Sequence, residues 1–242
     1  MRLSWIIPTY NEERRIEKTV REVESYLRPK GFQYEILVVD NGSRDRTSSI
    51  IENLRSEIPS LRLLHGTVPG KGGAVKRGML DAKGDIRLFS DADNSTSPDH
   101  FDKMEPLFAK GCEVAVSSRD PKDAAGAGRD IKEPVYREML GNLGNIIIQT
   151  FGVWGIWDTQ NGFKACTAAA ADKIFSQMKI RGFAFDIEML ALAKRYNYKL
   201  CVIPVKWRFD PDSKVTLTAY LSVFLDVFRI RWNLIRGVYA RQ

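Results

Sequence analysis

The stretch IRLFSDAD, residues 86–93, decides how this chain is expected to fold. Its mostly apolar first half predicts a buried strand, and two carboxylates one residue apart, Asp91 and Asp93, follow the strand directly. Two such carboxylates repel each other unless a cation lies between them. Their oxygens suit a hard divalent ion, Mg²⁺ or Mn²⁺, which can also hold a substrate diphosphate. The alternative interpretation is a helix N-cap followed by a polar turn at residues 94–98.

Upstream of this stretch, strand and helix patterns alternate along the chain. Short apolar runs predict strands at residues 3–7, 34–39, 61–64, 86–89 and 113–117. Helical patterns occupy residues 12–27, 45–54 and 72–82. This alternation predicts an α/β fold, with a mostly parallel sheet and helices on both of its faces. In sheets of this kind, ligands bind beyond the carboxyl ends of the strands.

Polar and glycine-rich stretches follow the predicted strands and should gather at one edge of the sheet. Residues 8–13 follow the first strand, residues 40–45 the second and residues 70–73 the third. An acidic residue directly after a strand, such as Asp40, can hydrogen-bond a ribose hydroxyl or a base N–H. The glycine run lets the backbone approach a phosphate, and Lys71 adds a positive charge, although the spacing is not that of a P-loop. The alternatives are a capped turn and an ordinary flexible loop.

The composition is consistent with one large α/β domain that has anionic partners. The chain has 242 residues, 44% of them hydrophobic, which suffices for one large domain or two small ones, and no repeat or linker divides it. A formal net charge of +7 favours nucleic acid, phosphorylated substrates or an acidic membrane surface. The basic residues do not have the spacing of a nucleic-acid-binding module, so we expect no nucleic-acid partner.

The cysteines and the first strand indicate the expected environment. Cys112, Cys166 and Cys201 are odd in number, lie far apart and have no metal-binding spacing, which indicates a reducing compartment. The first apolar run, residues 3–7, ends at Pro8 and is far too short for a signal peptide.

Two segments have features of a membrane contact. Residues 139–157 carry no charge, but their asparagines, glutamine and four glycines make a poor transmembrane span, so we expect a buried core helix or an interfacial one. From residue 217 onward, arginines alternate with apolar residues at helical spacing: Leu221, Phe224, Leu225, Phe228, Trp232, Ile235 and Tyr239. This pattern predicts an amphipathic helix on a membrane surface. The alternative is a helix packed on the domain, and both hold if each takes one face.

Four motifs together carry a resemblance to a known family. IIPTYNEE (6–13), VVDNGSRDRT (38–47), GKGGAVKRGM (70–79) and DADNS (91–95) resemble the inverting family 2 glycosyltransferases of the GT-A, Rossmann-like fold, over essentially the whole chain. Downstream, Ser118-Arg119-Asp120, DTQNGFKA (158–165) and GFAFDIEML (182–190) are similar to polyprenyl-phosphate glycosyltransferases, the dolichyl-phosphate glucose and mannose synthases. DTQNGFK followed by FAFDIEML and by PVKW…SKV most resembles the dolichyl-phosphate β-glucosyltransferases.

The resemblance implies roles for particular residues. Those implied for the nucleotide sugar are Pro8, Tyr10, Glu12, Asp40, Lys71 and Asp91. Those implied for the acceptor are Arg119, Arg137, Asp158, Gln160, Asn161 and Lys214. Asp91 and Asp93 are implied as ligands of Mg²⁺ or Mn²⁺, and the residues implied in catalysis are Asp91, Asp93, Arg119 and Asp186.

Two positions bear on the sugar and on the base. Ser95 stands where mannose synthases of this group often have glutamine, which weakens a mannose assignment. Asp186 and Glu188 could form a general-base pair. The alternative is that they orient the acceptor loop or hydrogen-bond sugar hydroxyls.

The resulting expectation is an enzyme that moves a hexose, most of all glucose from UDP-glucose, onto a polyprenyl phosphate with inversion. The alternatives use GDP-mannose or UDP-N-acetylglucosamine, glycosylate another saccharide, or bind a nucleotide sugar without catalysis, against which the intact acidic pair argues. We expect a catalytic region at residues 1–210 and an amphipathic segment of the same domain at 211–242. We also expect a peripheral location on the cytoplasmic face of a membrane, with no transmembrane span. The oligomeric state stays open.

Overall fold

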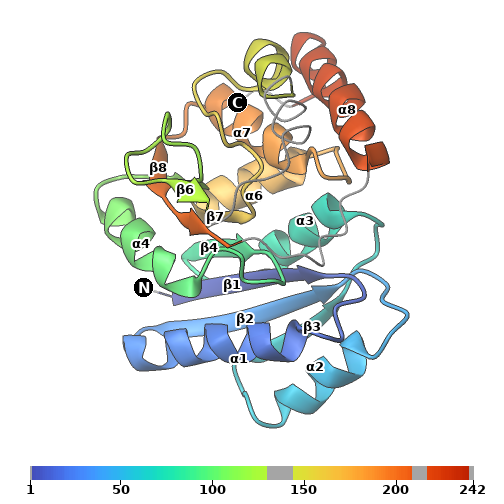
Figure 1. The fold of residues 1–242 in the computed structure, drawn as a ribbon, viewed down its shortest axis with the longest axis vertical. Helices are drawn as coiled ribbons and strands as arrows, with labels where there is room; N and C mark the ends of the chain where they lie inside the picture. Colours follow the sequence, from blue (N-terminus) through green and yellow to red (C-terminus); the bar gives the residue numbers. More distant parts are fainter. Residues whose placement is uncertain (1, 130–143, 209–216, 240–242) are drawn as a thin grey trace.

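A seven-stranded, mostly parallel sheet forms the centre of the molecule (Figure 1). The computed structural model describes residues 2–129, 144–208 and 217–239. Within these residues the strand order is β3-β2-β1-β4-β7-β5-β8. The strands are β1 (Arg2–Thr9), β2 (Gln33–Asp40), β3 (Leu61–His65), β4 (Ile86–Ser90), β5 (Val114–Ser118), β7 (Phe163–Thr167) and β8 (Leu200–Pro204). Neighbouring strands run parallel, except that β7 is antiparallel to both β4 and β5. β6 (Gly128–Arg129) and β9 (Lys206–Trp207) form a separate parallel pair.

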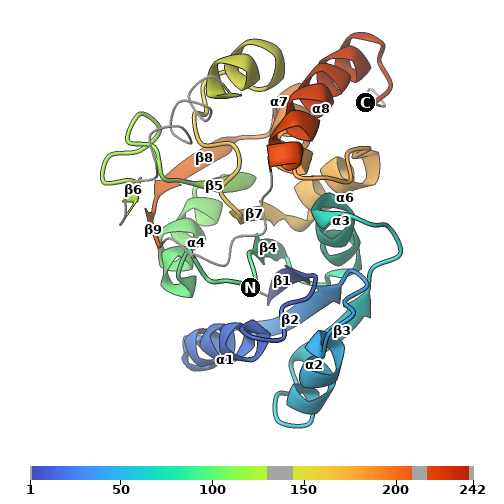
Figure 2. The same ribbon diagram turned by 45° about the vertical axis from the view of Figure 1, so that its right-hand side comes forward.

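Helices cover both faces of the sheet, as the sequence predicts (Figures 1 and 2). One hydrophobic cluster joins the sheet to three helices: α1 (Ile16–Leu27), α2 (Thr47–Arg55) and α4 (Phe101–Ala109). The other cluster joins the opposite face to α3 (Lys71–Asp81), α6 (Ala168–Gln177), α7 (Phe185–Arg195) and α8 (Leu217–Ile235). The predicted α/β class is therefore confirmed.

Burial of both sheet faces explains the apolar runs in the sequence. In β1, every residue from Leu3 to Thr9 is buried, as expected of a parallel strand covered on both sides. Helix α3 packs tightly on β1. A Cβ added at Gly78 of α3 would lie only 2.4 Å from Ile6 Cγ2, so no larger residue fits there. Gly78 thus allows α3 to lie close against β1.

The sequence patterns do not predict β7, the antiparallel strand. It inserts between β4 and β5 and brings the 158–165 motif beside the acidic pair at the end of β4. Lys164 is fully buried in this strand and interrupts its apolar pattern. A charged residue in a buried strand requires a partner elsewhere in the fold, and sequence periodicity gives no sign of that partner.

A disulfide joins the beginnings of two neighbouring strands. Cys112, just before β5, is bonded to Cys201 in β8, with Cα atoms 6.1 Å apart. The sequence analysis, which took the number and spacing of the cysteines to indicate a reducing compartment, did not predict this pair. The two residues are 89 positions apart, so only the pairing of β5 with β8 reveals their proximity. Cys166 is free and buried, and burial raises the pKa of its thiol to about 12.

The C-terminal helix α8 has one buried and one exposed face. Val223, Val227 and Ile230 lie in the hydrophobic core. The opposite side exposes five apolar residues, Leu221, Leu225, Phe228, Trp232 and Ile235. The buried side bears out the alternative of a helix packed on the domain, while the membrane contact of the exposed side stays a prediction. Tyr239, however, was placed on the apolar face by its spacing and is fully buried instead. No helix among the described residues is long and apolar enough to cross a membrane.

Candidate active site

Asp91 and Asp93 follow β4, and the ammonium group of Lys71 lies beside them. Lys71 is the first residue of α3, and its Nζ lies 2.6 Å from Asp91 Oδ1. The backbone N–H of Ser95 donates to Asp93 Oδ1 over 2.9 Å. The sequence required a cation next to this carboxylate pair, and Lys71 supplies a positive charge at Asp91.

The charges at this strand end influence one another strongly. Burial raises the pKa of Asp93, and the negative charge of Asp91 raises it further. Burial alone would lower the pKa of Lys71, but the carboxylates of Asp91, Asp186 and Asp93 raise it above its ordinary value. Lys71 therefore stays protonated, and the site still favours additional positive charge.

Gly162 allows the carboxylate of Asp91 to lie against the backbone of the 158–165 motif. The backbone N–H of Asp91 donates to the carbonyl of Gly162 over 3.1 Å. A Cβ added at Gly162 would lie 2.1 Å from Asp91 Oδ2, so any side chain there would displace the carboxylate. Sequence reasoning missed Gly162, because the contact joins segments that are far apart in the chain.

A buried ion pair lies close enough to the acidic pair for the charges of Lys71 and Asp91 to act on it. Lys164 is 0% and Asp186 2% exposed, and Lys164 Nζ lies 2.5 Å from Asp186 Oδ1. Lys164 also donates to the carbonyl of Asn161. Burial raises the pKa of Asp186, while the Lys164 ammonium acts in the opposite direction. The sequence singled out Asp186 and missed Lys164, although a lysine inside an otherwise apolar run was the available signal.

Arg119 and Asp158, both predicted to contact the acceptor, are bonded to each other. Arg119 Nε lies 2.8 Å from Asp158 Oδ2, and Nη2 lies 2.7 Å from Oδ1, which makes a bidentate pair. The Arg119 backbone N–H donates to the same carboxylate over 2.7 Å. Burial would raise the pKa of Asp158, but the Arg119 guanidinium lowers it below its usual range. The guanidinium also lies 5.3 Å from the ring centre of Trp207.

The predicted nucleotide-binding residues Pro8, Tyr10 and Asp40 lie at or next to the carboxyl ends of β1 and β2. Asp40 is buried, and its carboxylate accepts hydrogen bonds from the backbone N–H of Ser43 (3.0 Å) and from the Ser43 and Ser48 hydroxyls. The alternative interpretation of Asp40 as a turn-capping residue thus describes its local bonds. Tyr10, at the end of β1, is 48% exposed.

The remaining predicted residues occupy diverse environments. Pro8 is buried within β1, and Glu12 forms an ion pair with Arg15. Gln160 is exposed on the 158–165 motif. Arg137 and Lys214 lie outside the described residues.

Asn161 is the one predicted acceptor residue that presents a buried hydrogen-bond donor with no partner in the described structure. The side chain is 2% exposed, and its Oδ1 accepts from the Thr96 hydroxyl over 3.2 Å. Its Nδ2 makes no hydrogen bond to any described residue. A buried polar atom of this kind is costly unless a ligand or water satisfies it.

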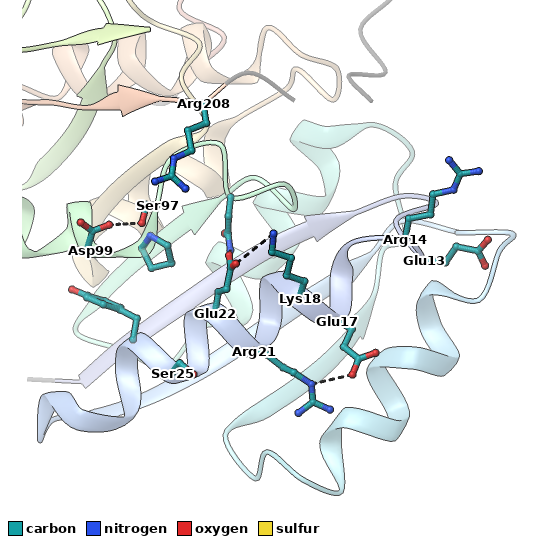
Figure 3. Close-up of a pocket in the computed structure, with 13 residues that line it drawn as sticks. Glu13, Arg14, Glu17, Lys18, Arg21, Glu22, Ser25, Ser97, Asp99 and Arg208 are labelled. Carbon is teal, nitrogen blue, oxygen red and sulfur yellow. Dashed lines mark hydrogen bonds and ion pairs between the residues drawn. The ribbon is translucent and has the colours of Figure 1, made fainter. Parts of the chain in front are cut away.

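A surface groove of about 860 Å³ runs between α1 and the loop that follows Asp93, whose residues Ser97 and Asp99 line it (Figure 3). Its acidic and basic side chains pair within the groove, as Lys18 with Glu22 and Arg21 with Glu17. None of the predicted site residues lines it. Since its charges are balanced and the acidic pair lies elsewhere, we assign it no part in the chemistry.

Comparison with known proteins identifies the class to which this fold and site belong. Residues 4–175 match Glycosyl transferase family 2, so the chain belongs to this family and is a glycosyltransferase. Among its relatives, the dolichyl-phosphate β-glucosyltransferase ALG5A of Trichomonas vaginalis is 31% identical and aligns with 94% of this chain and 72% of its own length. The Saccharomyces cerevisiae dolichyl-phosphate β-glucosyltransferase is 32% identical over 98% of this chain and 76% of that protein. The human one is 30% identical, with 98% and 77% covered.

Solved structures share the fold at much lower identity. Glucosyl-3-phosphoglycerate synthase from Mycobacterium tuberculosis, in complex with Mn²⁺, UDP and phosphoglyceric acid, superposes with a TM-score of 0.69. It is 18% identical, with 99% of this chain and 79% of that chain covered. The GT-A fold expected from the sequence is therefore confirmed.

Proposed function

We propose that this protein transfers glucose from UDP-glucose to a polyprenyl phosphate, with inversion, at a membrane surface. The observation that carries the proposal is the Asp91–Asp93 pair with the Lys71 ammonium 2.6 Å from Asp91, at the strand ends of a family 2 chain. The names of its relatives, dolichyl-phosphate β-glucosyltransferases, support the sugar and the acceptor. The location on the cytoplasmic face is part of this proposal.

Radiolabel transfer from a panel of nucleotide sugars into organic-extractable lipid tests the proposed function. UDP-glucose, GDP-mannose and UDP-N-acetylglucosamine are each supplied with a polyprenyl phosphate, and each also with a soluble saccharide. We expect label from UDP-glucose in the lipid fraction. Label from GDP-mannose alone, or label only in the saccharide, would contradict the proposal, and no transfer at all would point to a nucleotide-sugar binder.

The acidic pair fits Mg²⁺ or Mn²⁺. Its donors are carboxylate oxygens, and burial together with Asp91 raises the pKa of Asp93, so a divalent ion would relieve an unfavourable pair of charges. No group of three or more His, Cys, Asp or Glu side chains suited to a metal occurs among the described residues, so diphosphate oxygens and water would complete the coordination. The Mn²⁺ and UDP bound to the Mycobacterium tuberculosis synthase support this use of metal. The ion would stabilise the charge of the departing nucleoside diphosphate.

Transfer of this kind needs no strong general base. The second pKa of a phosphate monoester is about 6, so the acceptor oxygen is mostly ionised near neutral pH. Asp186 is held by Lys164, and Glu188 accepts hydrogen bonds from the backbone of residues 179–180. We therefore propose that these carboxylates support the site, that the acceptor phosphate itself attacks the anomeric carbon, and that Lys71 neutralises the leaving diphosphate.

Asn161 and Arg119 are proposed to act on the acceptor side. Asn161 Nδ2 has no described partner and can donate to a sugar hydroxyl or a phosphate oxygen. Arg119, whose orientation is fixed by Asp158, would attract the lipid phosphate through its positive charge. Arg137 and Lys214 remain predictions for the same task.

Arg119→Lys is expected to weaken use of the lipid phosphate more than binding of the nucleotide sugar. Lysine keeps the charge beside Asp158 but loses the bidentate geometry, and a charged hydrogen bond contributes about 1.5–3 kcal/mol. The KM for the polyprenyl phosphate should therefore rise about tenfold or more, with the KM for UDP-glucose nearly unchanged. Steady-state kinetics with each substrate varied in turn would measure both values. Equal increases for both substrates would show that Arg119 does not serve the acceptor in particular.

The membrane surface is proposed to contact the exposed side of α8 and of the neighbouring π-helix η3 (Ile148–Gly152). We call this set the apolar face: Phe151, Trp154, Leu221, Leu225, Phe228, Trp232 and Ile235. The rings of Phe151 and Phe228 lie 5.1 Å apart, which joins the two elements into one surface. Exposed arginines 229, 231 and 236 lie along the same helix and its end. Apolar residues with nearby basic ones are typical of interfacial helices.

Replacing Leu225, Phe228 and Trp232 together with serine is expected to release the protein from vesicles that contain phosphatidylserine. All three side chains are exposed, so the fold should stay intact, whereas insertion loses apolar area worth about 25 cal/mol per Å². Vesicle sedimentation measures the effect, with Leu80→Ser, an exposed apolar residue of α3, as the matched control. Unchanged vesicle binding of the triple variant would move the contact to another surface.

A further inference from the structure

Glu188, a buried carboxylate of α7 that takes no part in proton transfer, holds one loop through backbone hydrogen bonds. Its side chain is 0% exposed. Glu188 Oε2 accepts from the backbone N–H of Ile180 over 2.8 Å, and both of its oxygens accept from the N–H of Lys179 at 3.0 Å. A buried carboxylate requires such donors, because an unpaired charge is costly in the interior. Glu188 therefore fixes the backbone of residues 179–180.

The loop that Glu188 holds packs directly on the glycine run that carries Lys71. The backbone N–H of Gly73 donates to the carbonyl of Arg181 over 3.2 Å. A Cβ added at Gly70 would lie 2.3 Å from the same carbonyl, so backbone meets backbone with no side chain between. A shift of this loop would therefore shift the first turn of α3, in which Lys71 lies 2.6 Å from Asp91.

The third partner of Glu188 comes from the segment after α8. The hydroxyl of Tyr239 donates to Glu188 Oε1 over 2.6 Å, and the Tyr239 side chain is 0% exposed. Burial, and then the bond to Glu188, raise the pKa of the Tyr239 hydroxyl, so it remains a donor. In addition, a Cβ added at Gly182 would lie 3.8 Å from Asp226 Oδ2 of α8. The loop thus lies between the start of α3 and the C-terminal segment.

We propose that Glu188 is a positioning residue for the donor-binding end of α3, and that Tyr239 completes it from the C-terminal segment. This inference rests on the proposed contact of Lys71 with the donor diphosphate. Helix α8 and the residues that follow it then have two separate tasks. The apolar face of α8 contacts lipid, and Tyr239, beyond the helix, holds the donor site in place even when no membrane is present.

Tyr239→Phe tests this inference, because it removes one hydroxyl and keeps the ring that fills the core. In lipid-free solution with Mn²⁺, we expect the Kd for UDP to rise about tenfold by calorimetry, since a hydrogen bond to a charged group is lost. The KM for UDP-glucose should rise by a similar factor. The KM for polyprenyl phosphate and the binding to phosphatidylserine vesicles should match the wild type. A merely structural role would lower the binding stoichiometry and kcat, and leave Kd and KM unchanged.

Two further variants sharpen the test. Tyr26→Phe is the matched control. The hydroxyl of Tyr26 in α1 donates to the carboxylate of Asp102 in α4 over 2.6 Å, and Tyr26 packs in the hydrophobic cluster on the side of the sheet opposite α3 and α7. It should leave the Kd for UDP unchanged. Glu188→Gln puts an amide N–H₂ where the carboxylate accepts from backbone donors, and we expect a larger rise in Kd than for Tyr239→Phe.

The outcomes separate this inference from the proposed function. Wild-type protein that binds neither UDP nor GDP would overturn both. Wild-type protein that binds UDP, with Tyr239→Phe binding it equally well, would overturn the positioning role alone. Binding of GDP in place of UDP would contradict the proposed donor, and the same comparison with GDP would then decide the role of Tyr239.

Discussion

Replacing Asp93 with asparagine is expected to reduce glycosyl transfer by about a thousandfold, while the protein stays folded. The variant keeps the size and the hydrogen bond from the Ser95 backbone but removes one anionic metal ligand. Loss of metal-assisted stabilisation of the leaving diphosphate costs several kcal/mol, and about 4 kcal/mol corresponds to a thousandfold in rate. The lipid-extraction assay measures the loss.

The control for this variant is Asp99→Asn, which removes an exposed carboxylate from the same polar loop and should leave transfer near the wild-type rate. Excess EDTA should reproduce the effect of Asp93→Asn in the wild-type protein, and added Mn²⁺ should restore the rate. Full activity of Asp93→Asn, or wild-type rates in EDTA, would disprove the metal role of the acidic pair. Thermal unfolding of the variant should occur at or above the wild-type temperature, because burial and the charge of Asp91 make the ionised form of Asp93 unfavourable in the folded protein.

Lys164→Met is expected to lower the free energy of unfolding by about 3–5 kcal/mol, the cost of leaving one partner of a buried ion pair alone. Lys164 is 0% exposed, and the variant would leave Asp186, which is 2% exposed, without its cation. Urea denaturation followed by circular dichroism measures the change, at constant m-value.

The double variant Lys164→Met, Asp186→Leu separates the ion pair from simple packing. Removing both charges together should recover much of the lost stability, because apolar residues of similar volume can replace a buried pair. A single variant as stable as the wild type would show that water or another group compensates Asp186. A double variant less stable than the single one would show that packing, not charge, decides the cost.

Several groups from different parts of the chain surround the acidic pair. The two carboxylates are backed by Gly162, flanked by Lys71 and followed by the Lys164–Asp186 pair. Gly162 lies directly before β7, Lys71 at the start of α3, Lys164 in β7 and Asp186 in α7. Contacts from several elements therefore hold the acidic pair. Fixed positions favour the proposed reaction, because two anions, the donor diphosphate and the acceptor phosphate, have to be placed close together.

The proximity of Lys71 to the acidic pair after β4 could be predicted from the sequence alone. Parallel strands present their carboxyl ends at one edge of a sheet, so an alternating strand and helix pattern predicts that the segments after successive strands meet. Lys71 follows β3 and Asp91 follows β4, and Lys71 Nζ lies 2.6 Å from Asp91 Oδ1. This proximity is predictable because the alternation of strands and helices, which brings the carboxyl ends of parallel strands together, is visible in local sequence patterns.

The acceptor side could be predicted only in part. The sequence named Arg119 and Asp158 as separate acceptor residues, whereas the structure bonds them to each other through two hydrogen bonds between the side chains. Spacing along the chain contains no information on which way a guanidinium points. The choice of partner depends on how β5 and the 158–165 motif come together around the antiparallel strand β7, which the sequence patterns do not predict.

What the sequence by itself determined is the α/β class, the buried and exposed sides of α8 and the acidic pair at a strand end, because hydrophobic periodicity and the succession of elements along the chain are local properties. What only the tertiary structure decided is a set of long-range contacts: Gly162 with Asp91, Lys164 with Asp186, Cys112 with Cys201, and Tyr239 with Glu188. Helical spacing placed Tyr239 on the exposed face, but the chain turns after α8 and buries its ring. Such contacts depend on the packing of distant segments, where a buried charge or hydroxyl takes whichever partner the fold brings within reach.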